Sequence, residues 1–271
     1  MRLSITLTAT DPIHRTIPVN YQYPLSAWIY HTIGEGNHAF ARFLHDTGFI
    51  NGTKKYKLFT FSQLSFPSRG FKVEQDRLRI ISQQCSFVIS FMVPAAIEHF
   101  VAGIFTHQHF TLGDHISQTP FQVSAVEVLP EPEFCEHIKL RLVSPLVIGK
   151  QVEHCPTAEY LAPDHPDYCQ ILTDNLIRKY TTLLQAGLIS SRPELVSSIP
   201  TVKTEILNTP RKWGIIIKAH TPAQTKIIGY TYDFSLTAPA ELIKTGYLCG
   251  FGEKNALGMG CVEEISTIRT K

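Results

Sequence analysis

The stretch FQVSAVEVLPEPE, residues 121–133, lies at the middle of a chain of 271 residues. Its first nine residues are rich in apolar and β-branched side chains and predict a strand. The PEPE sequence that follows, residues 130–133, is the best linker candidate in the chain. We therefore predict two domains, at residues 1–129 and 134–271, each within the usual size range of an independent domain.

On both sides of this linker, hydrophobic periodicity and the positions of glycine and proline predict similar series of elements. Before it we expect strand 3–7, helices 25–33 and 38–46, strands 57–62, 78–81 and 85–93, helix 95–105 and strand 121–129. After it we expect strand 138–143, helix 168–186, strands 201–207, 214–219 and 227–236, helix 240–245, a glycine-rich hairpin and strand 260–265. Each half reads as strand–helix–strands–helix–strand, which is the split βαβ pattern. The predicted fold class is α+β, with two tandem ferredoxin-like (RRM-like) domains.

Composition narrows the class of protein. Hydrophobic residues make up 44% of the chain, which is enough for a real core, and the formal net charge is only +2. Binding to nucleic acid would therefore need a local basic patch. The sequence shows no secretory leader and no apolar run of membrane-spanning length. Six cysteines lie without paired spacing, as in reduced cytosolic proteins, so we expect a cytoplasmic location.

One short segment contains four residues of the types that bind zinc, namely His154, Cys155, His165 and Cys169. Their spacing matches no standard zinc knuckle, and the adjacent His154 and Cys155 would need an awkward backbone to reach one ion. We interpret the segment as a polar loop and expect no metal.

The most specific feature is the glycine-rich segment, residues 246–260, which holds five glycines, two Gly-X-Gly pairs and Lys254. Glycine permits positive φ and close approach of another backbone, and successive N–H groups can form an anion-binding concavity. The spacing fits neither a Walker loop nor a dinucleotide fingerprint. A structural hairpin and a phosphate-binding loop both remain open on these residues alone.

The string GYLCGFGEKNALGMGCVE at residues 246–263 resembles the C-terminal glycine-rich loop of the CRISPR-associated repeat-RNA endoribonucleases of the RAMP superfamily. YQYPLSAWIY at 21–30, FLHD at 43–46 and YKLFTFS at 56–62 follow in the order that this family shows. Between about residues 130 and 240 the resemblance extends only to the order of elements. It implies a catalytic set of Tyr30, His45 and Lys57. It also implies RNA contacts by the segment's glycines and lysine, namely Gly246, Gly250, Gly252, Lys254, Gly258 and Gly260.

Tyr30, His45 and Lys57 can also be interpreted without the resemblance. In the expected helix 38–46, His38, Arg42 and His45 share a polar face, opposite Ala39, Phe40, Phe43 and Leu44. An exposed histidine near the end of a helix is the ordinary alternative for His45. Tyr30 would ordinarily be a core aromatic, and Lys57 a solvated residue that begins a strand. Lys139 and Arg141 alternate with apolar residues on one strand, so that strand has a basic face, which we interpret as an RNA contact or as solubilising charge.

RNA carries its own nucleophile, the 2′-hydroxyl, so a base, an acid and a cation suffice to cut it. The resemblance implies a metal-independent endoribonuclease that cuts CRISPR repeat RNA and leaves 2′,3′-cyclic phosphate and 5′-hydroxyl ends, with no cofactor. The expected partners are repeat RNA and other CRISPR effector proteins, with a monomer and a homodimer both open. The alternatives are a RAMP protein that holds RNA without cutting it and a small-molecule enzyme that binds a phosphorylated ligand.

Overall fold

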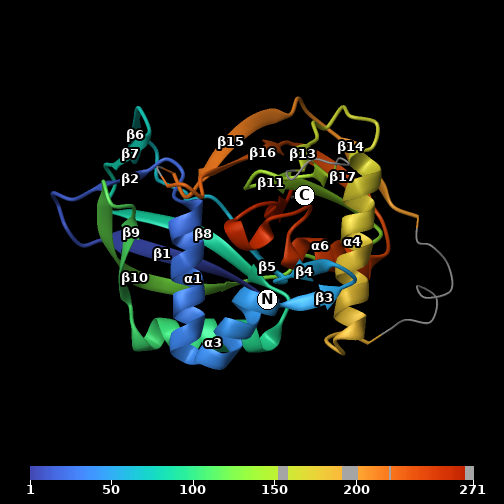
Figure 1. Ribbon diagram of the computed structural model, residues 1–271, viewed down its shortest axis with the longest axis horizontal. Helices are drawn as coiled ribbons and strands as arrows, with labels where there is room; N and C mark the ends of the chain where they lie inside the picture. The colour runs from blue at the N-terminus through green and yellow to red at the C-terminus, as the bar shows by residue number, and fades with distance from the viewer. Residues whose placement is uncertain (152–157, 191–200, 220, 266–271) are drawn as a thin grey trace, which may run out of the picture.

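The computed structural model describes residues 1–151, 158–190, 201–219 and 221–265. The chain forms two sheet-and-helix units that lie next to each other, with the N-terminal unit on the left and the C-terminal unit on the right in Figure 1. None of the helices in the described segments has the length and apolarity needed to cross a lipid bilayer.

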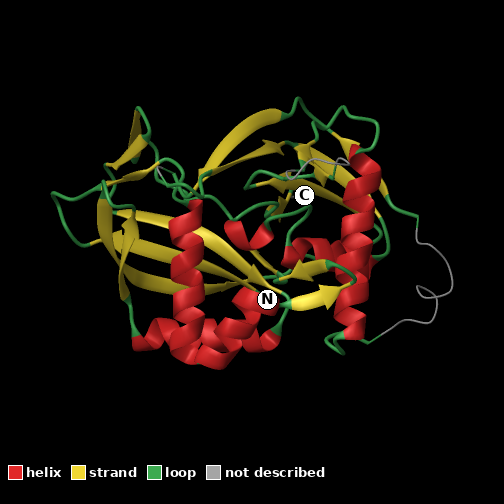
Figure 2. Ribbon diagram, viewed as in Figure 1, coloured by secondary structure: helices red, strands yellow, loops and turns green. Residues whose placement is uncertain are grey.

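The N-terminal unit is built on a five-stranded antiparallel sheet with the order β5-β8-β1-β10-β9. Its strands are β1 (Arg2–Ala9), β5 (Phe59–Phe61), β8 (Gln84–Phe91), β9 (His109–Gly113) and β10 (Gln118–Leu129). Helices α1 (Gln22–Gly36) and α3 (Pro94–Thr106) pack against each other over this sheet (Figure 2). Along the chain, β1, α1, β5, β8, α3 and β10 give a sheet order of fourth, first, third and second strand, which is the split βαβ arrangement.

The C-terminal unit repeats this arrangement on a four-stranded antiparallel sheet with the order β14-β17-β11-β18. Its elements are β11 (His137–Leu142), α4 (Tyr168–Gln185), β14 (Lys203–Ile206), β17 (Asp233–Thr237), α6 (Ala240–Cys249) and β18 (Val262–Glu264). The spatial order is second, third, first and fourth strand, so both units have the same topology. The predicted fold class of two ferredoxin-like domains is confirmed.

Four smaller sheets accompany the two main sheets in the described residues. They are the three-stranded sheet β2 (Thr16–Pro18), β7 (Arg77–Ile80) and β6 (Phe71–Glu74), and the pairs β3 (Phe49–Asn51) with β4 (Lys54–Tyr56), β12 (Gly149–Lys150) with β13 (Glu159–Tyr160), and β15 (Arg211–Ile217) with β16 (Thr225–Thr231). The hairpin β3–β4 belongs to the N-terminal unit but reaches α4, where the side chain of Asn51 donates to the carbonyl of Arg178 at 3.4 Å.

Alternation along the first strand of each unit places its core. In β1, Leu3, Ile5 and Leu7 are buried, and in β11 the same holds for Ile138, Leu140 and Leu142. Each set belongs to the main hydrophobic cluster of its own unit. Burial of one such side chain stabilises the fold by about 1.5–3 kcal/mol. Strand β10 ends at Leu129 and β11 begins at His137; the domain boundary between residues 129 and 134 stays a prediction.

Arg2 joins the two units. Its side chain is buried, its guanidinium lies 4.2 Å from the ring centroid of Tyr247 on α6, and Nη2 lies 3.7 Å from the sulfur of Cys261. A cation over an aromatic face is stabilising, the more so when both are removed from water. The start of the first strand is thus packed against α6 and Cys261 of the C-terminal unit.

Two expected elements of the first half differ from the structure. The expected strand 57–62 is interrupted because Leu58 has a φ of 57°, which no strand residue adopts, so Lys57 lies between β4 and β5. The expected helix 38–46 is a short α-helix, α2 (His38–Arg42), followed by one π-type turn, η1 (Phe43–Thr47). As a result Phe43 is exposed rather than packed with Leu44, and the expected apolar face is wrong at Phe43 and at the exposed Ala39.

Two further predictions fail in the second half. Residues 227–236 form two strands instead of one, because Tyr232 separates β16 from β17. The helix expected at 240–245 continues to Cys249, so Gly246 lies inside α6 and not in a hairpin. A Cβ at Gly246 would overlap the ring of Phe251, so this glycine serves close packing. The helix ends instead at Gly250, whose φ of +83° suits a glycine.

Candidate active site

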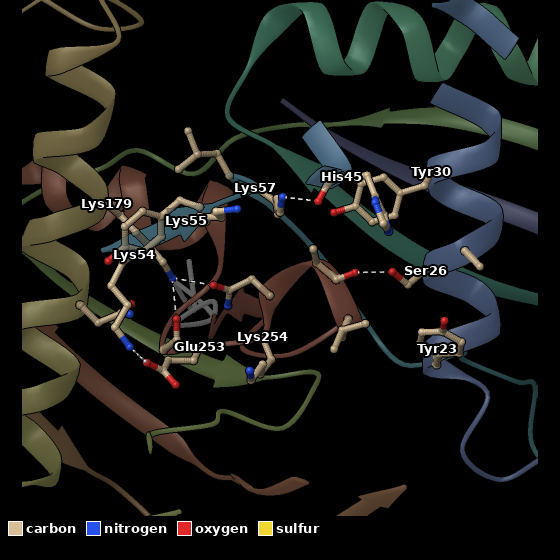
Figure 3. Close-up of a pocket in the computed structure, with 18 residues that line it drawn as sticks. Tyr23, Ser26, Tyr30, His45, Lys54, Lys55, Lys57, Lys179, Glu253 and Lys254 are labelled. Atoms are coloured by element: carbon tan, nitrogen blue, oxygen red, sulfur yellow. Dashed lines mark hydrogen bonds and ion pairs between the residues drawn. The ribbon is translucent and has the colours of Figure 1, made fainter. Parts of the chain in front are cut away.

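A cavity of about 540 Å³ opens between α1, the β4–β5 connection, α4 and the outer part of the glycine-rich segment (Figure 3). Tyr30, His45 and Lys57 line it from the N-terminal unit. Gly252 and Lys254 line it from the C-terminal unit. The fold therefore brings the three predicted catalytic residues together on one side of the cavity and part of the glycine-rich segment on the other.

His45 is the central residue of the π-type turn η1. Asn37 begins the preceding helix by accepting a hydrogen bond from the backbone of Phe40 at 3.0 Å, and Gly48 ends the turn by donating to the carbonyl of Phe43 at 2.7 Å. Such single π-turns occur frequently at functional sites. The His45 side chain is 68% exposed, and its Nδ1 lies 2.7 Å from a carboxylate oxygen of Asp46. This hydrogen bond lowers the pKa of Asp46.

Tyr30 lies on α1 and meets His45 edge to face, with ring centroids 5.2 Å apart. Phe59 supports the same ring at 5.5 Å, also edge to face. Burial raises the pKa of the Tyr30 phenol well above its ordinary value. Because the charged form is disfavoured, the hydroxyl keeps its proton near neutral pH.

Lys57 reaches the same place from the β4–β5 connection. Its Nζ donates to the backbone carbonyl of His45 at 2.5 Å, which fixes the ammonium beside the imidazole-bearing turn (Figure 3). Burial, with a contribution from the nearby charge of Lys55, lowers the pKa of Lys57, and the carboxylate of Asp46 acts in the opposite direction.

The cavity is rich in positive charge. Five lysines line it, namely Lys54, Lys55, Lys57, Lys179 and Lys254, and Glu253 is the acidic residue in the same lining. Lys54 pairs with Glu253 across the two units, with Nζ and Oε1 3.1 Å apart. A concave surface of one charge sign concentrates ligands of the opposite sign, so this cavity suits a polyanion although the whole chain is nearly neutral.

Lys179 is not among the residues predicted for the site, although it is central to it. Its side chain is only 2% exposed, and Nζ donates to the carbonyls of Gly250 and Gly252 and to the amide oxygen of Asn255, at 2.6, 2.7 and 2.7 Å. A signal was present in the sequence, because the lysine falls between Leu176 and Leu183 on the apolar face of the expected helix 168–186. A lysine in such a position needs buried partners.

The glycine-rich segment directs several of its polar backbone atoms into the protein. The N–H of Gly258 donates to the carbonyl of Asn255, and that of Gly260 to the carbonyl of Pro145, each at 2.8 Å. Neither group is therefore available to a phosphate in this conformation, and Gly246 lies within α6. Of the glycines predicted to bind RNA, Gly252 lines the cavity, and Gly246, Gly250, Gly258 and Gly260 do not.

Lys139 and Arg141 lie on the exposed face of β11, away from the lining of the cavity. Both Nε and Nη2 of Arg141 donate to the carboxylate of Asp233 at 3.0 Å, and Glu263 lies 3.9 Å from Nη1. Two carboxylates thus offset the charge of Arg141, so this strand face is less basic than its sequence suggests. Its contact with RNA stays a prediction.

Two of the four residues of zinc-binding type, His165 and Cys169, lie in the described part of the chain. His154 and Cys155 lie outside the described residues, whereas Nδ1 of His165 accepts a hydrogen bond from the backbone of Asp167 at 3.1 Å, and Cys169 is exposed. Within the described ranges, no three residues of metal-binding type gather in a way that could hold an ion.

Two ferredoxin-like units in tandem, with a lysine-lined cavity between them and a glycine-rich segment at its edge, define a RAMP-type protein. The family model for the C-terminal part of CRISPR-associated protein Cas6 matches residues 129–264, and the model for its N-terminal part matches residues 16–127. The chain belongs to the Cas6 family of CRISPR-associated proteins.

Individual relatives agree over nearly the whole length. The chain is 26% identical to CRISPR-associated endoribonuclease Cas6 1 of Methanocaldococcus jannaschii, over 98% of this chain and 93% of the relative. It is 25% identical to CRISPR-associated endoribonuclease Cas6 of Pyrococcus furiosus, over 100% and 92%. The solved structure of a Cas6-related gene product from Pyrococcus furiosus superposes with a TM-score of 0.78 at 22% identity, over 98% of this chain and 99% of that one.

Proposed function

We propose that this chain is the endoribonuclease that cuts CRISPR repeat RNA, with Tyr30, His45 and Lys57 as its catalytic residues. The observation that carries the proposal is their convergence: residues from a helix, a π-type turn and a loop meet at one wall of a lysine-lined cavity. The chain is an endoribonuclease of its family, and its two named relatives share that activity.

The chemistry assigns each group a task that its surroundings suit. His45 is exposed to the cavity and accepts the proton of the 2′-hydroxyl, as imidazoles do near neutral pH. Burial raises the pKa of the Tyr30 phenol, so the group holds a proton near neutral pH, and it can donate this proton to the departing 5′-alkoxide, which is the stronger base. The ammonium of Lys57 stabilises the charge that develops on the phosphorane. The products would carry 2′,3′-cyclic phosphate and 5′-hydroxyl ends.

No step of this scheme requires a metal, so the test is cleavage of cognate repeat RNA in EDTA, followed by analysis of the end groups. We expect undiminished cleavage and a 5′-hydroxyl that a kinase can label without prior phosphatase treatment. If EDTA stops cleavage and a divalent cation restores it, the metal-independent mechanism is wrong.

A second function, holding repeat RNA without cutting it, is favoured by one feature of the site. Nδ1 of His45 is engaged by Asp46, and Nζ of Lys57 by the carbonyl of His45, so two of the three groups already have partners within the chain. The same assay decides between the functions. Saturable binding of repeat RNA with no product after long incubation would favour the binding protein.

A further inference from the structure

The buried side chain of Lys179 is the centre of a hydrogen-bonded core beneath the glycine-rich segment. Its ammonium group donates to three acceptors of that segment, the carbonyls of Gly250 and Gly252 and the side chain of Asn255. Figure 3 shows it approaching the segment from α4, on the side away from α1. An ammonium has three protons, so each acceptor receives one.

Asn255 extends this core across the segment. While its amide oxygen accepts from Lys179, its amide nitrogen donates to the carbonyls of Phe251 and Met259, each at 2.9 Å. The side chain of Asn255 thereby joins the two ends of the turn in which it lies, at Phe251 and at Met259. Met259 is further held from the N-terminal unit by the hydroxyl of Thr60, which donates to its carbonyl at 2.9 Å.

The neighbouring residue Ala256 carries the contact to the candidate catalytic helix. The hydroxyl of Ser26 on α1 donates to the carbonyl of Ala256 at 2.6 Å (Figure 3). Ser26 precedes Tyr30 by four residues, so the two side chains lie on the same face of α1, one turn apart. A continuous series of contacts therefore runs from Lys179 through Asn255 and Ala256 to the helix that carries Tyr30.

We propose that Lys179 is a positioning residue for RNA cleavage: it fixes the glycine-rich segment by its carbonyl groups and, through Ser26, sets the place of Tyr30 relative to His45. The inference rests on the proposed cleavage function. Removing the ammonium takes the donor from the carbonyls of the buried Gly250 and Gly252 and from the half-buried amide oxygen of Asn255, which favours movement of the segment. A displacement of about 1 Å at a reacting group can cost about 100-fold in rate.

The test compares Lys179→Met, which keeps the length of the side chain and loses all three donors, with Lys150→Met as the matched control. Lys150 is an exposed lysine of the same unit, paired with Asp167, and it does not line the cavity. In single-turnover cleavage at saturating enzyme we expect Lys179→Met to be about 10- to 100-fold slower. The dissociation constant for repeat RNA should stay within about threefold, because all three protons of the Lys179 ammonium are already donated to the glycine-rich segment. Lys150→Met should cut at the rate of the natural chain.

Ser26→Ala is a second variant, needed if Lys179→Met does not fold. It removes one hydroxyl at the other end of the series of contacts between Lys179 and α1. We expect it to slow cleavage by about 3- to 10-fold, which corresponds to the loss of one hydrogen bond of about 1 kcal/mol. The inference is overturned if folded Lys179→Met cleaves at the natural rate. If Lys179→Met fails to fold, cleavage at the natural rate by Ser26→Ala overturns it. The inference is also overturned if a loss of RNA affinity accounts for the whole loss of activity.

A readout that needs no cleavage separates this inference from the proposed function. With 3-fluorotyrosine in place of tyrosine and the Tyr30 signal assigned by Tyr30→Phe, the fluorine resonance should move in Lys179→Met and not in Lys150→Met. If the natural chain does not cut repeat RNA, the proposed function fails, and this shift still decides whether Lys179 positions Tyr30. An unchanged Tyr30 resonance in the folded Lys179→Met variant overturns the inference in either case.

Discussion

The two walls of the cavity are built from different kinds of chemical group. On the N-terminal wall, formed by Tyr30, His45 and Lys57, titratable side chains come from three separate elements. On the C-terminal wall, formed by residues 252–257, the backbone carbonyls of Gly252 and Ala256 accept hydrogen bonds from Lys179 and Ser26. One wall presents groups that can exchange protons, and the other has most of its hydrogen-bonding capacity used inside the protein. We infer that chemistry depends on the first wall and rigidity on the second.

Loss of the imidazole on the N-terminal wall should have the largest effect. We expect His45→Ala to slow cleavage about 100- to 10,000-fold, the usual contribution of general acid–base catalysis. Affinity for repeat RNA should change little. Single-turnover cleavage with a parallel binding assay measures both, and His38→Ala is the control, since His38 is exposed on the adjacent helix and does not line the cavity. Equal rates for His45→Ala and the natural chain would remove His45 from the mechanism.

Close packing in the glycine-rich segment, which carries the C-terminal wall, is tested by Gly260→Ala, which should lower the free energy of unfolding by about 2–4 kcal/mol. Gly260 has a φ of +69°, and a Cβ there would overlap the carbonyl oxygen of Phe251. The control is Gly187→Ala, which has a similar φ of +66° but nothing within 4 Å of the added carbon, and should cost about 1 kcal/mol. Denaturant unfolding compares the two, and equal losses would show that strain, not packing, decides the stability at Gly260.

The buried ammonium should make stability depend on pH. Burial lowers the pKa of Lys179 to about 8, whereas an unfolded lysine keeps its proton to about pH 10.4. Between these values the unfolded chain binds more protons, so stability rises with pH, by up to about 1.4 kcal/mol per pH unit. The difference in free energy of unfolding between the natural chain and Lys179→Met should be flat below pH 8 and grow in favour of the natural chain from pH 8 to 9.5. A flat difference over the whole range would contradict the lowered pKa.

The smallest effect concerns RNA holding by Lys254, the exposed lysine of the C-terminal wall. Lys254→Ala should weaken repeat binding several-fold and reduce the dependence of log affinity on log salt by about 0.7, the value for one phosphate contact with a single strand. Arg141→Ala should do less, because Asp233 and Glu263 already offset its charge. Titrations at several salt concentrations measure both slopes. A larger change for Arg141→Ala would place the RNA on β11 and not along the cavity.

Local pattern predicted much of the architecture. The alternation of Leu3, Ile5 and Leu7 and of Ile138, Leu140 and Leu142 is a property of neighbouring residues, and the structure buries both sets. Two of the predictions failed at single residues. Helix α6 continues through Gly246, against which the ring of Phe251 packs, and the strand expected at 57–62 is interrupted by the positive φ of Leu58.

The sequence by itself determined the two-unit fold through hydrophobic periodicity, and it indicated Tyr30, His45 and Lys57 through the resemblance of short motifs. Only the tertiary structure decided that these three meet at one wall and that the glycine-rich segment turns its carbonyls inward to Lys179, 71 residues before Gly250 in the chain. The physical reason is that hydrophobic periodicity predicts which side chains are buried in the core. The partners of a buried ammonium, and the direction of a backbone carbonyl, depend on which elements the fold places side by side.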